Sequence, residues 1–195
     1  MKFSYPVGAT PLDADELAGL IPKHITLQAQ LNAWEEQNIL AAQQWAFKQR
    51  DGLLTVNFII KLHQRMFDHT WLWAGKLRQT EKNIGIQWFL IPTELKKLCD
   101  DVNYQLSVGT FSPDEIAVRL HYRLVWIHPF TNGNGRHARL MADLLITKLG
   151  RPRFSWGMQQ VSDLYQATPV RQQYIAALQA ADQGDYAKLI AFARS

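Results

Sequence analysis

The sequence predicts a mostly helical domain with a small β-hairpin next to a polar loop. Apolar residues recur at helical spacing over 26–49, over 113–127 and again after the loop. A partly alternating apolar stretch over 80–92 could form two short strands. The chain has 195 residues, 47% of them hydrophobic, and no segment resembles a linker or a repeat. Such a chain can bury one core, so we expect a single domain over residues 1–195.

The N-terminal part contains an amphipathic helix. Residues 1–24 are expected to form an extended lead-in, in which a short helical turn is an option. Over 26–49, the inward stripe at helical spacing consists of Leu27, Leu31, Trp34, Asn38, Ala42 and Trp45. Glu35 lies at the edge of this stripe, whereas Glu36 is rotated by about 100° and should be more exposed.

A second helix, over 113–127, is specified at both ends. Ser112 is an N-cap residue, Pro113 suits the first helical position and Glu115 completes a capping box. Pro129 disfavours the helical region for the residue before it, so this helix should end at His128.

Histidines at 121, 128 and 137 could suggest a zinc site. They lack the short ligand pairing that zinc sites usually show, so we disfavour zinc. His121 is instead expected to be packed or hydrogen-bonded, and His137 is expected to face solvent.

The loop that begins at His128 suggests anion binding. Gly133 and Gly135 allow positive φ, which lets consecutive backbone N–H groups converge on an anion. The loop leads into a helix that runs to Gly150, with the apolar pattern Met141, Leu144, Leu145 and Leu149. At the N-terminus of such a helix, free N–H groups and the helix dipole favour negative charge.

Two arginines and a histidine make phosphate the expected anion. Arg136 and Arg139 share one face of the first turns, where exposed cations oppose the dipole by roughly 0.3–1 kcal/mol each. That cost is understandable if a polyphosphate lies beside them, because guanidinium binds phosphate bidentately. With an ordinary pKa of about 6.5, His128 can act as general base toward a hydroxyl.

These residues resemble the Fic motif, which has a histidine, a phenylalanine, an acidic residue, Gly-Asn-Gly-Arg and a final arginine. Fic proteins are all-helical enzymes that typically transfer AMP from ATP to a Ser, Thr or Tyr hydroxyl of a target protein. The resemblance implies that His128 is the base, that Phe130 is a buried anchor, and that Arg136 and Arg139 contact the β- and γ-phosphates. It also implies a phosphate cradle made by the amides of Gly133, Asn134 and Gly135.

Asn132 departs from the motif. Fic proteins usually have Asp or Glu at this position, and that carboxylate holds the Mg²⁺ (or Mn²⁺) that bridges two phosphates of ATP. Asn132 keeps a carbonyl oxygen but lacks the charge. Three outcomes stay open: weaker metal binding, transfer of another group, or a nucleotide-binding or partner-binding module without turnover. We favour adenylylation. Phosphate transfer of the Doc type is disfavoured because Gly133 is retained.

The resemblance extends to residues 67–78, which are similar to the segment before the β-hairpin flap of Fic proteins. The flap would then span 80–92, where Ile84, Gly85 and Ile86 would clamp an extended segment of the target by strand addition. An ordinary surface hairpin that caps the core is the alternative.

The resemblance also suggests autoinhibition. Many Fic proteins carry an inhibitory helix with Ser or Thr, three residues, Glu, then Gly or Asn. Here Leu31, Glu35 and Glu36 occupy these positions, so only the Glu matches. The resemblance implies that Glu35 pairs with Arg139 and blocks the γ-phosphate. A solvated glutamate on the helix surface is the alternative.

The C-terminal part is expected to hold two helices, over 171–181 and 185–193, after a loop-like stretch over 151–168. In Fic proteins this part helps to shape the adenine pocket, and Tyr174 is our candidate for it. A core tyrosine with a bonded hydroxyl is the alternative.

Residues 1–24 also resemble the start of mobile mystery protein B, a bacterial Fic subgroup of mobile elements.

Composition narrows the partners. The net charge of +4 fits a phosphate-binding enzyme, but no basic stripe with interleaved aromatic residues points to nucleic acid. Cys99 is the single cysteine, which excludes an internal disulfide. No secretion signal and no apolar run long enough for a membrane helix is visible. We therefore expect a cytoplasmic protein whose partners are a protein target and a cognate regulator.

Overall fold

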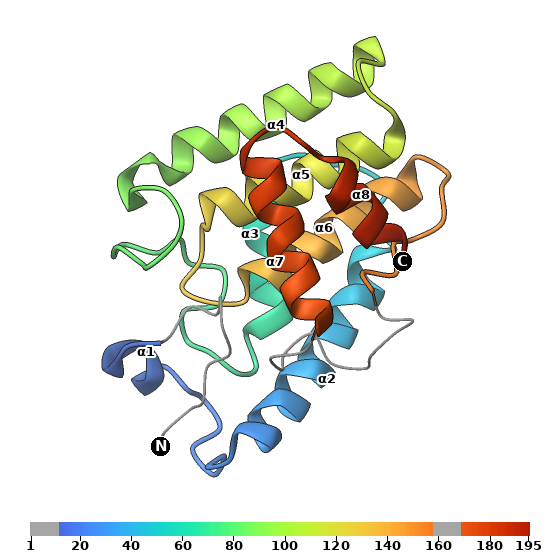
Figure 1. Cartoon of the computed structure of the whole chain (residues 1–195). Helices are drawn as coiled ribbons and strands as arrows, with labels where there is room; N and C mark the ends of the chain where they lie inside the picture. The colour runs from blue at the N-terminus through green and yellow to red at the C-terminus, as the bar shows by residue number, and fades with distance from the viewer. Residues whose placement is uncertain (1–11, 158–168) are drawn as a thin grey trace.

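The chain folds into a bundle of helices (Figure 1), described over residues 12–157 and 169–195 of a computed structural model. In chain order the elements are α1 (Ala14–Ala18), α2 (Gln28–Ala46), α3 (Val56–Phe67), the 3-10 turn η1 (Trp88–Leu90), α4 (Ile91–Val108), α5 (Pro113–Ile127), α6 (Asn134–Lys148), α7 (Pro169–Asp182) and α8 (Ala187–Arg194). The predicted helical class is confirmed.

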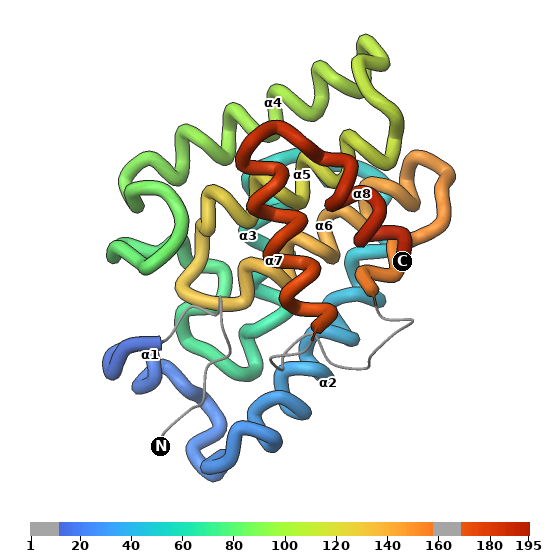
Figure 2. The backbone as a smooth tube through the Cα atoms, in the orientation of Figure 1, coloured from blue at the N-terminus to red at the C-terminus, as the bar shows by residue number. Residues whose placement is uncertain are grey.

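Helices α5 and α6 lie in the middle of the bundle and pack against each other (Figure 2). Helices α4 and α8 pack on α5, whereas α3 packs on α6 and α2 covers α3. Ala138 and Ala142 on α6 are fully buried, and such small side chains let neighbouring helices approach closely. The polar loop that joins α5 to α6 is therefore held between two rigid, buried elements.

The N-cap and the proline signals for α5 act as predicted, whereas the capping box is incomplete because the Glu115 carboxylate accepts from Arg119 instead. The Ser112 hydroxyl accepts a hydrogen bond from the Glu115 N–H at 3.2 Å, and Pro113 is the first helical residue. Ile127 is the last helical residue, as expected from Pro129. The helices predicted over 26–49, 171–181 and 185–193 are also present as α2, α7 and α8, with ends shifted by one to three residues.

The prediction of a hairpin over 80–92 is wrong. Residues 80–87 form bends and irregular backbone, and the segment then continues through η1 into α4. Its apolar residue Ile91 belongs to a helical stripe with Leu95, Leu98 and Val102, all buried against the core. Burying this stripe against the core favours a helix from residue 91 onward. The partly alternating apolar residues before it form no strand.

The short helical turn in the lead-in is confirmed as α1. Asp13 and Glu16 form a capping box, with both hydrogen bonds at 2.9 Å. Predictions for residues 1–11 and for residues 158–168 fall outside the described part of the chain. Among the described helices, none combines the length and the apolar character needed to cross a membrane.

Candidate active site

His128 stands at the junction of α5 and the polar loop. Its backbone is left-handed, with φ 53° and ψ 60°, and its N–H still donates to the Leu124 carbonyl at 3.1 Å. The side chain is almost fully buried, with 5% of the residue exposed. Burial lowers the pKa of the imidazole to about 4, and the charges of Arg78 and, less strongly, Lys82 act in the same direction. The ring is therefore uncharged at neutral pH.

The loop is fixed by the Asn134 side chain and by an aromatic stack. The Asn134 amide accepts from the Phe130 N–H at 2.9 Å and donates to the Phe130 carbonyl at 2.8 Å. The Phe130 ring is fully buried, as expected for an anchor, and stacks on His63 with 3.7 Å between ring centroids. These contacts hold the backbone of the loop from two sides.

His63 on α3 also determines how the loop backbone is oriented. The Gly75 N–H donates to Nδ1 of His63 at 3.0 Å, so the proton of the neutral ring is on Nε2. That Nε2–H donates to the Asn132 carbonyl at 3.0 Å. Burial holds the pKa of His63 well below its usual value, so the ring stays neutral and keeps these roles.

The predicted anion cradle coincides with the start of α6. Gly133 is its N-cap, with φ 77°, and a Cβ there would lie 2.5 Å from the Phe67 ring, so glycine is required. Gly135, by contrast, is not among the residues with positive φ, so that expectation is wrong for it. The amides of Asn134 and Gly135 are in the first helical turn, where backbone donors have no intrahelical acceptor.

Arg136 is engaged by a carboxylate from another helix. Its Nη1 donates to Oε2 of Glu35 on α2 at 2.5 Å, and its guanidinium lies 4.7 Å from the centroid of the Phe67 ring. Oε1 of Glu35 accepts from the indole N–H of Trp71 at 2.6 Å. Glu35, predicted at the edge of the inward stripe, is buried, which excludes the alternative of a solvated glutamate, and Glu36 is the more exposed of the two, as predicted. The predicted partner is wrong, because Glu35 reaches Arg136 rather than Arg139.

Arg139 points toward α7 instead. Its guanidinium lies 5.8 Å from the centroid of the Tyr174 ring and hydrogen-bonds the Tyr174 hydroxyl. That hydroxyl also contacts Nε2 of His121 at 3.1 Å. The expectation that His121 is packed and bonded is confirmed, as is the alternative of a core tyrosine with a bonded hydroxyl at position 174. Arg139 is one helical turn beyond Arg136, which explains why the two arginines have different partners.

His137 does not face solvent, contrary to prediction. Only 1% of the residue is exposed, and Nε2 lies 2.9 Å from the Ile59 carbonyl on α3. The first turn of α6 directs this position toward α3, and burial lowers the pKa of His137 to about 4. Over the described residues, no group of three or more His, Cys, Asp or Glu side chains could hold a metal ion.

The segment predicted as the flap runs beside His128 even though it contains no strand. Gly85 has φ 99°, and a Cβ there would lie 2.5 Å from the His128 Cβ. Ile84 is exposed and Ile86 is half-buried. Gly85 thus lies against the histidine, and its missing side chain permits that approach.

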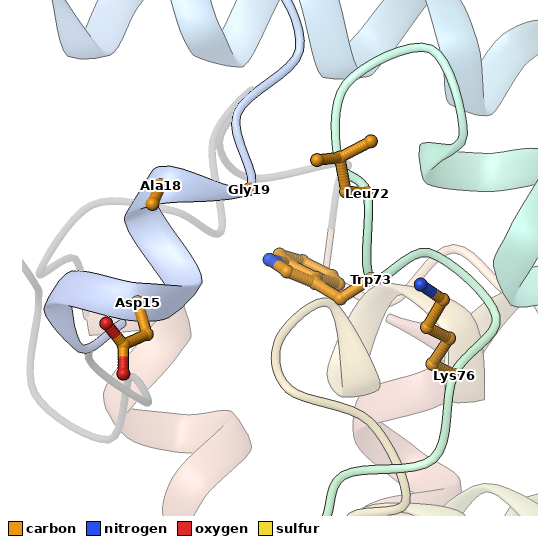
Figure 3. A pocket seen from close by; sticks show the side chains of 6 residues that line it. All are labelled: Asp15, Ala18, Gly19, Leu72, Trp73 and Lys76. Carbon is orange, nitrogen blue, oxygen red and sulfur yellow. The ribbon is translucent and has the colours of Figure 1, made fainter.

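An open pocket lies apart from these residues. It has a volume of about 340 Å³ and is lined by Asp15, Ala18, Gly19, Leu72, Trp73 and Lys76 (Figure 3). The Trp73 ring extends toward α1, and its indole N–H donates to the Glu16 carbonyl at 3.2 Å. None of the predicted site residues lines this pocket, so we assign the chemistry to the loop between α5 and α6.

The loop between α5 and α6 lies within a segment that matches a known protein family. Residues 53–146, which include α5, the loop and most of α6, match the model of the Fic/DOC family. The chain belongs to the Fic/DOC family. Its subgroup is not established by this match.

Several relatives of this Fic chain have names. It is 34% identical over 122 residues to "Protein adenylyltransferase Fic" of Nematostella vectensis, covering 60% of this chain and 29% of the relative. It is 31% identical over 137 residues to "Protein adenylyltransferase fic-1" of Caenorhabditis elegans, covering 68% and 25%. The chain thus spans less than a third of the length of these relatives.

Solved structures share the fold. Fic-1 (residues 134–508) from C. elegans superposes with a TM-score of 0.65 and 26% identity, covering 91% of this chain and 51% of that one. The N-terminal Fic domain of a putative cell filamentation protein from Bartonella quintana gives a TM-score of 0.68 at 19% identity, covering 89% and 84%. At that identity the second likeness shows the fold alone.

The metal ion that Fic motifs imply has a poor set of ligands in this chain. The amide oxygen of Asn132 accepts from the Gly133 N–H at 2.6 Å and lies 3.5 Å from Nη2 of Arg136. An oxygen that faces a backbone donor and a guanidinium is not arranged to bind a divalent cation. The residues at this position therefore do not fit a protein-held Mg²⁺.

Sequence reasoning missed three groups that shape the Fic site: the imidazole of His63, the side chain of Asn134 and the guanidinium of Arg78. His63 reaches Asn132 and Arg78 reaches His128 across 69 and 50 residues of sequence. Spacing patterns along the chain do not reveal contacts between residues so far apart in sequence. The Asn134 bonds are local, at a spacing of four residues, but the Fic motif drew attention to its amide instead.

Proposed function

We propose that this chain is a protein adenylyltransferase that transfers AMP from ATP to a Ser, Thr or Tyr hydroxyl of a target protein. The observation that carries the proposal is the uncharged imidazole of His128 beside a helix N-terminus that presents Arg136 and Arg139. Two relatives named protein adenylyltransferase support the proposal. This chain spans 29% and 25% of their lengths.

In the proposed reaction, the hydroxyl oxygen of the target forms a bond with the α-phosphorus of ATP. The bond from that phosphorus to the bridging oxygen breaks, and pyrophosphate leaves. His128 takes the hydroxyl proton, a role that contributes on the order of 10²–10⁴-fold in rate. The amides of Gly133, Asn134 and Gly135, with Arg136 and Arg139, are proposed to bind the leaving phosphates and to stabilise their charge.

We also propose that Glu35 restrains this reaction. Its carboxylate occupies Nη1 of Arg136, the group assigned to the β-phosphate. The Trp71 indole holds the other carboxylate oxygen in place. A phosphate must displace this ion pair before it can use the guanidinium, so autoinhibition would act through the first arginine of the motif.

Mg²⁺ or Mn²⁺ would arrive with the nucleotide. When bound, such an ion neutralises phosphate charge. Since the Asn132 oxygen faces the Gly133 N–H and Arg136, no step of the proposed mechanism depends on a metal held by the protein.

The same observation at Asn132 favours a second candidate, a nucleotide-binding or partner-binding Fic module without turnover. ATP labelled on the α- or the γ-phosphate separates the two, with Mg²⁺ or Mn²⁺ and Glu35→Gly protein, and label on the chain itself as the readout. We expect transfer from the α-position. Transfer from the γ-position alone would indicate kinase chemistry, and ATP binding with neither transfer would indicate the module.

His128→Ala is the matched control for that experiment. It should abolish transfer and leave ATP affinity largely intact, because the imidazole acts on the hydroxyl and not on the phosphates. Transfer by His128→Ala at the rate of Glu35→Gly protein would exclude the base assignment.

The remaining expectations rest on the resemblance. They are a target presented as an extended segment at Ile84, Gly85 and Ile86, a cognate regulator, a bacterial cytoplasmic location, and membership of the mobile mystery protein B subgroup. A single domain over 1–195 is proposed from the length and composition of the chain.

A further inference from the structure

Arg78 is a buried cation that joins two segments far apart in sequence. Only 3% of the residue is exposed. Its Nε donates to the His128 carbonyl at 2.7 Å, and its Nη2 lies 3.5 Å from the Ile127 carbonyl, both at the end of α5. On the other side, Nη1 donates to the Thr80 carbonyl at 2.9 Å and Nη2 donates to the Ile86 carbonyl. One guanidinium thus binds backbone carbonyls from both segments.

The backbone next to Arg78 adds to this connection. The Arg78 N–H donates to the Pro129 carbonyl at 3.0 Å, and Leu77 forms an isolated antiparallel bridge with Phe130. In Figure 1 the green segment before η1 runs beside the yellow loop that follows α5. Residues 77–78 therefore join the segment 80–87 to the loop through backbone and side-chain hydrogen bonds.

The attachment brings the segment into contact with His128. A Cβ at Gly85 would lie 2.5 Å from the His128 Cβ and 3.0 Å from Nη2 of Arg78. The His128 backbone is left-handed, a conformation that non-glycine residues adopt only when their surroundings hold it. The Arg78 bond to the His128 carbonyl is one such restraint.

We propose that Arg78 is a positioning residue that sets the imidazole of His128 and the backbone of residues 80–86 in one fixed geometry, so that the target hydroxyl meets the base. This inference rests on the proposed adenylyl transfer. Arg78 contacts neither ATP nor the hydroxyl in this account. It acts through the carbonyls of His128, Thr80 and Ile86.

The charge of Arg78 also acts directly on His128. The charge of Arg78 lowers the pKa of His128, second only to burial, and Lys82 has a smaller effect of the same sign. The Val125 carbonyl, on α5, is the partner that raises it. Removing the Arg78 charge should therefore raise the pH at which His128 titrates.

Lys82 provides the matched control. It is a buried cation in the same segment, but it pairs with Glu16 at 2.5 Å and Asp13 at 3.7 Å near α1. It has no hydrogen bond to α5 among those described. Lys82→Met thus removes a nearby charge and leaves the connection between the segment and His128 in place.

The experiment compares Arg78→Met, Arg78→Lys and Lys82→Met in the Glu35→Gly background. Automodification with α-labelled ATP gives the rate, and NMR of the His128 ring gives its titration midpoint. Arg78→Met should lower the rate at optimal pH by roughly 10²-fold and raise the midpoint, because misplacing a reacting group by about 1 Å has an effect of that size. Lys82→Met should raise the midpoint slightly and keep the rate.

Arg78→Lys keeps the charge but cannot span four carbonyls, so its midpoint should stay near that of the parent while its rate falls. A parental rate in Arg78→Lys, or an unshifted midpoint in folded Arg78→Met, would overturn the proposal. If Arg78→Met does not fold, Arg78→Lys decides. If the Glu35→Gly parent transfers no label, the proposed function fails. The NMR titration midpoints of His128 in the variants then test the coupling between Arg78 and His128 by themselves.

Discussion

His128 and Gly133 show how much the site depends on single backbone conformations. Both are left-handed, with φ 53° and 77°. For a residue with a side chain this conformation costs about 1–2 kcal/mol. The hydrogen bonds of the His128 N–H to Leu124 and of its carbonyl to Arg78 offset that cost. The histidine is thus placed by its neighbours as much as by its own position in the motif.

Acid should destabilise this protein through its buried histidines. The pKa values of His121, His128 and His137 are lowered to about 3, about 4 and about 4, and that of His63 is lowered as well. The unfolded chain then binds more protons than the folded one below a pH of about 6.5. The free energy of unfolding should therefore fall as pH decreases toward 4, by about 1.4 kcal/mol per pH unit for each histidine that titrates.

Denaturant titrations at pH 7 and at several lower pH values measure this slope. His121→Asn is a suitable control, because it removes one of the buried imidazoles and should reduce the slope. A free energy of unfolding that stays constant from neutral to mildly acidic pH would contradict the burial of these rings.

The helices differ in how much of them the sequence could predict. The ends of α5 follow from Ser112, Pro113 and Pro129, which act on adjacent residues. The same local chemistry caps α3 through Thr55, but its buried stripe became visible only in the structure. Before α4, the alternation of apolar and polar residues over 80–92 suggested two strands. The structure instead buries Ile91 in a helical stripe of α4.

Contacts between helices were beyond the reach of spacing patterns. The period of α2 predicted Glu35 at the edge of the inward stripe, and in the structure it is buried. Its choice of Arg136 depends on how α2 and α3 are placed against α6, which no local pattern encodes. The sequence motif alone pointed to the amides and arginines of the candidate site. Their contacts with other helices, such as Glu35 on α2 and Tyr174 on α7, could not be predicted from it.

The α2–α6 ion pair leads to a prediction on nucleotide affinity. Glu35→Gln keeps an oxygen for the Trp71 indole but removes the charge that engages Arg136. A hydrogen bond to a charged group contributes about 1.5–3 kcal/mol, so the dissociation constant for ATP should fall by roughly tenfold or more. Isothermal titration calorimetry measures this change.

Glu36→Gln is the control for that measurement. Glu36 is the exposed neighbour on the same helix, so its charge is screened by solvent and its replacement should leave ATP affinity unchanged. If Glu35→Gln binds ATP no more tightly than Glu36→Gln, the carboxylate does not compete with phosphate.

At the scale of the whole molecule, three regions converge on the loop between α5 and α6 and on the first turn of α6. Helix α2 supplies Glu35, helix α3 supplies His63, and the segment before η1 supplies Arg78. The central α5–α6 pair holds the loop itself, whose Phe130 ring is fully buried. The bundle therefore places the neutral imidazole of His128 and the side chains of Arg136 and Arg139 near the start of α6.

A crystal structure of Glu35→Gly protein with a non-hydrolysable ATP analogue tests this arrangement most directly. We expect phosphate density on the amides of Asn134 and Gly135, with the guanidinium groups of Arg136 and Arg139 turned toward it and the α-phosphorus facing His128. Nucleotide bound elsewhere on the molecule, with both arginines still turned away from it, would contradict the account.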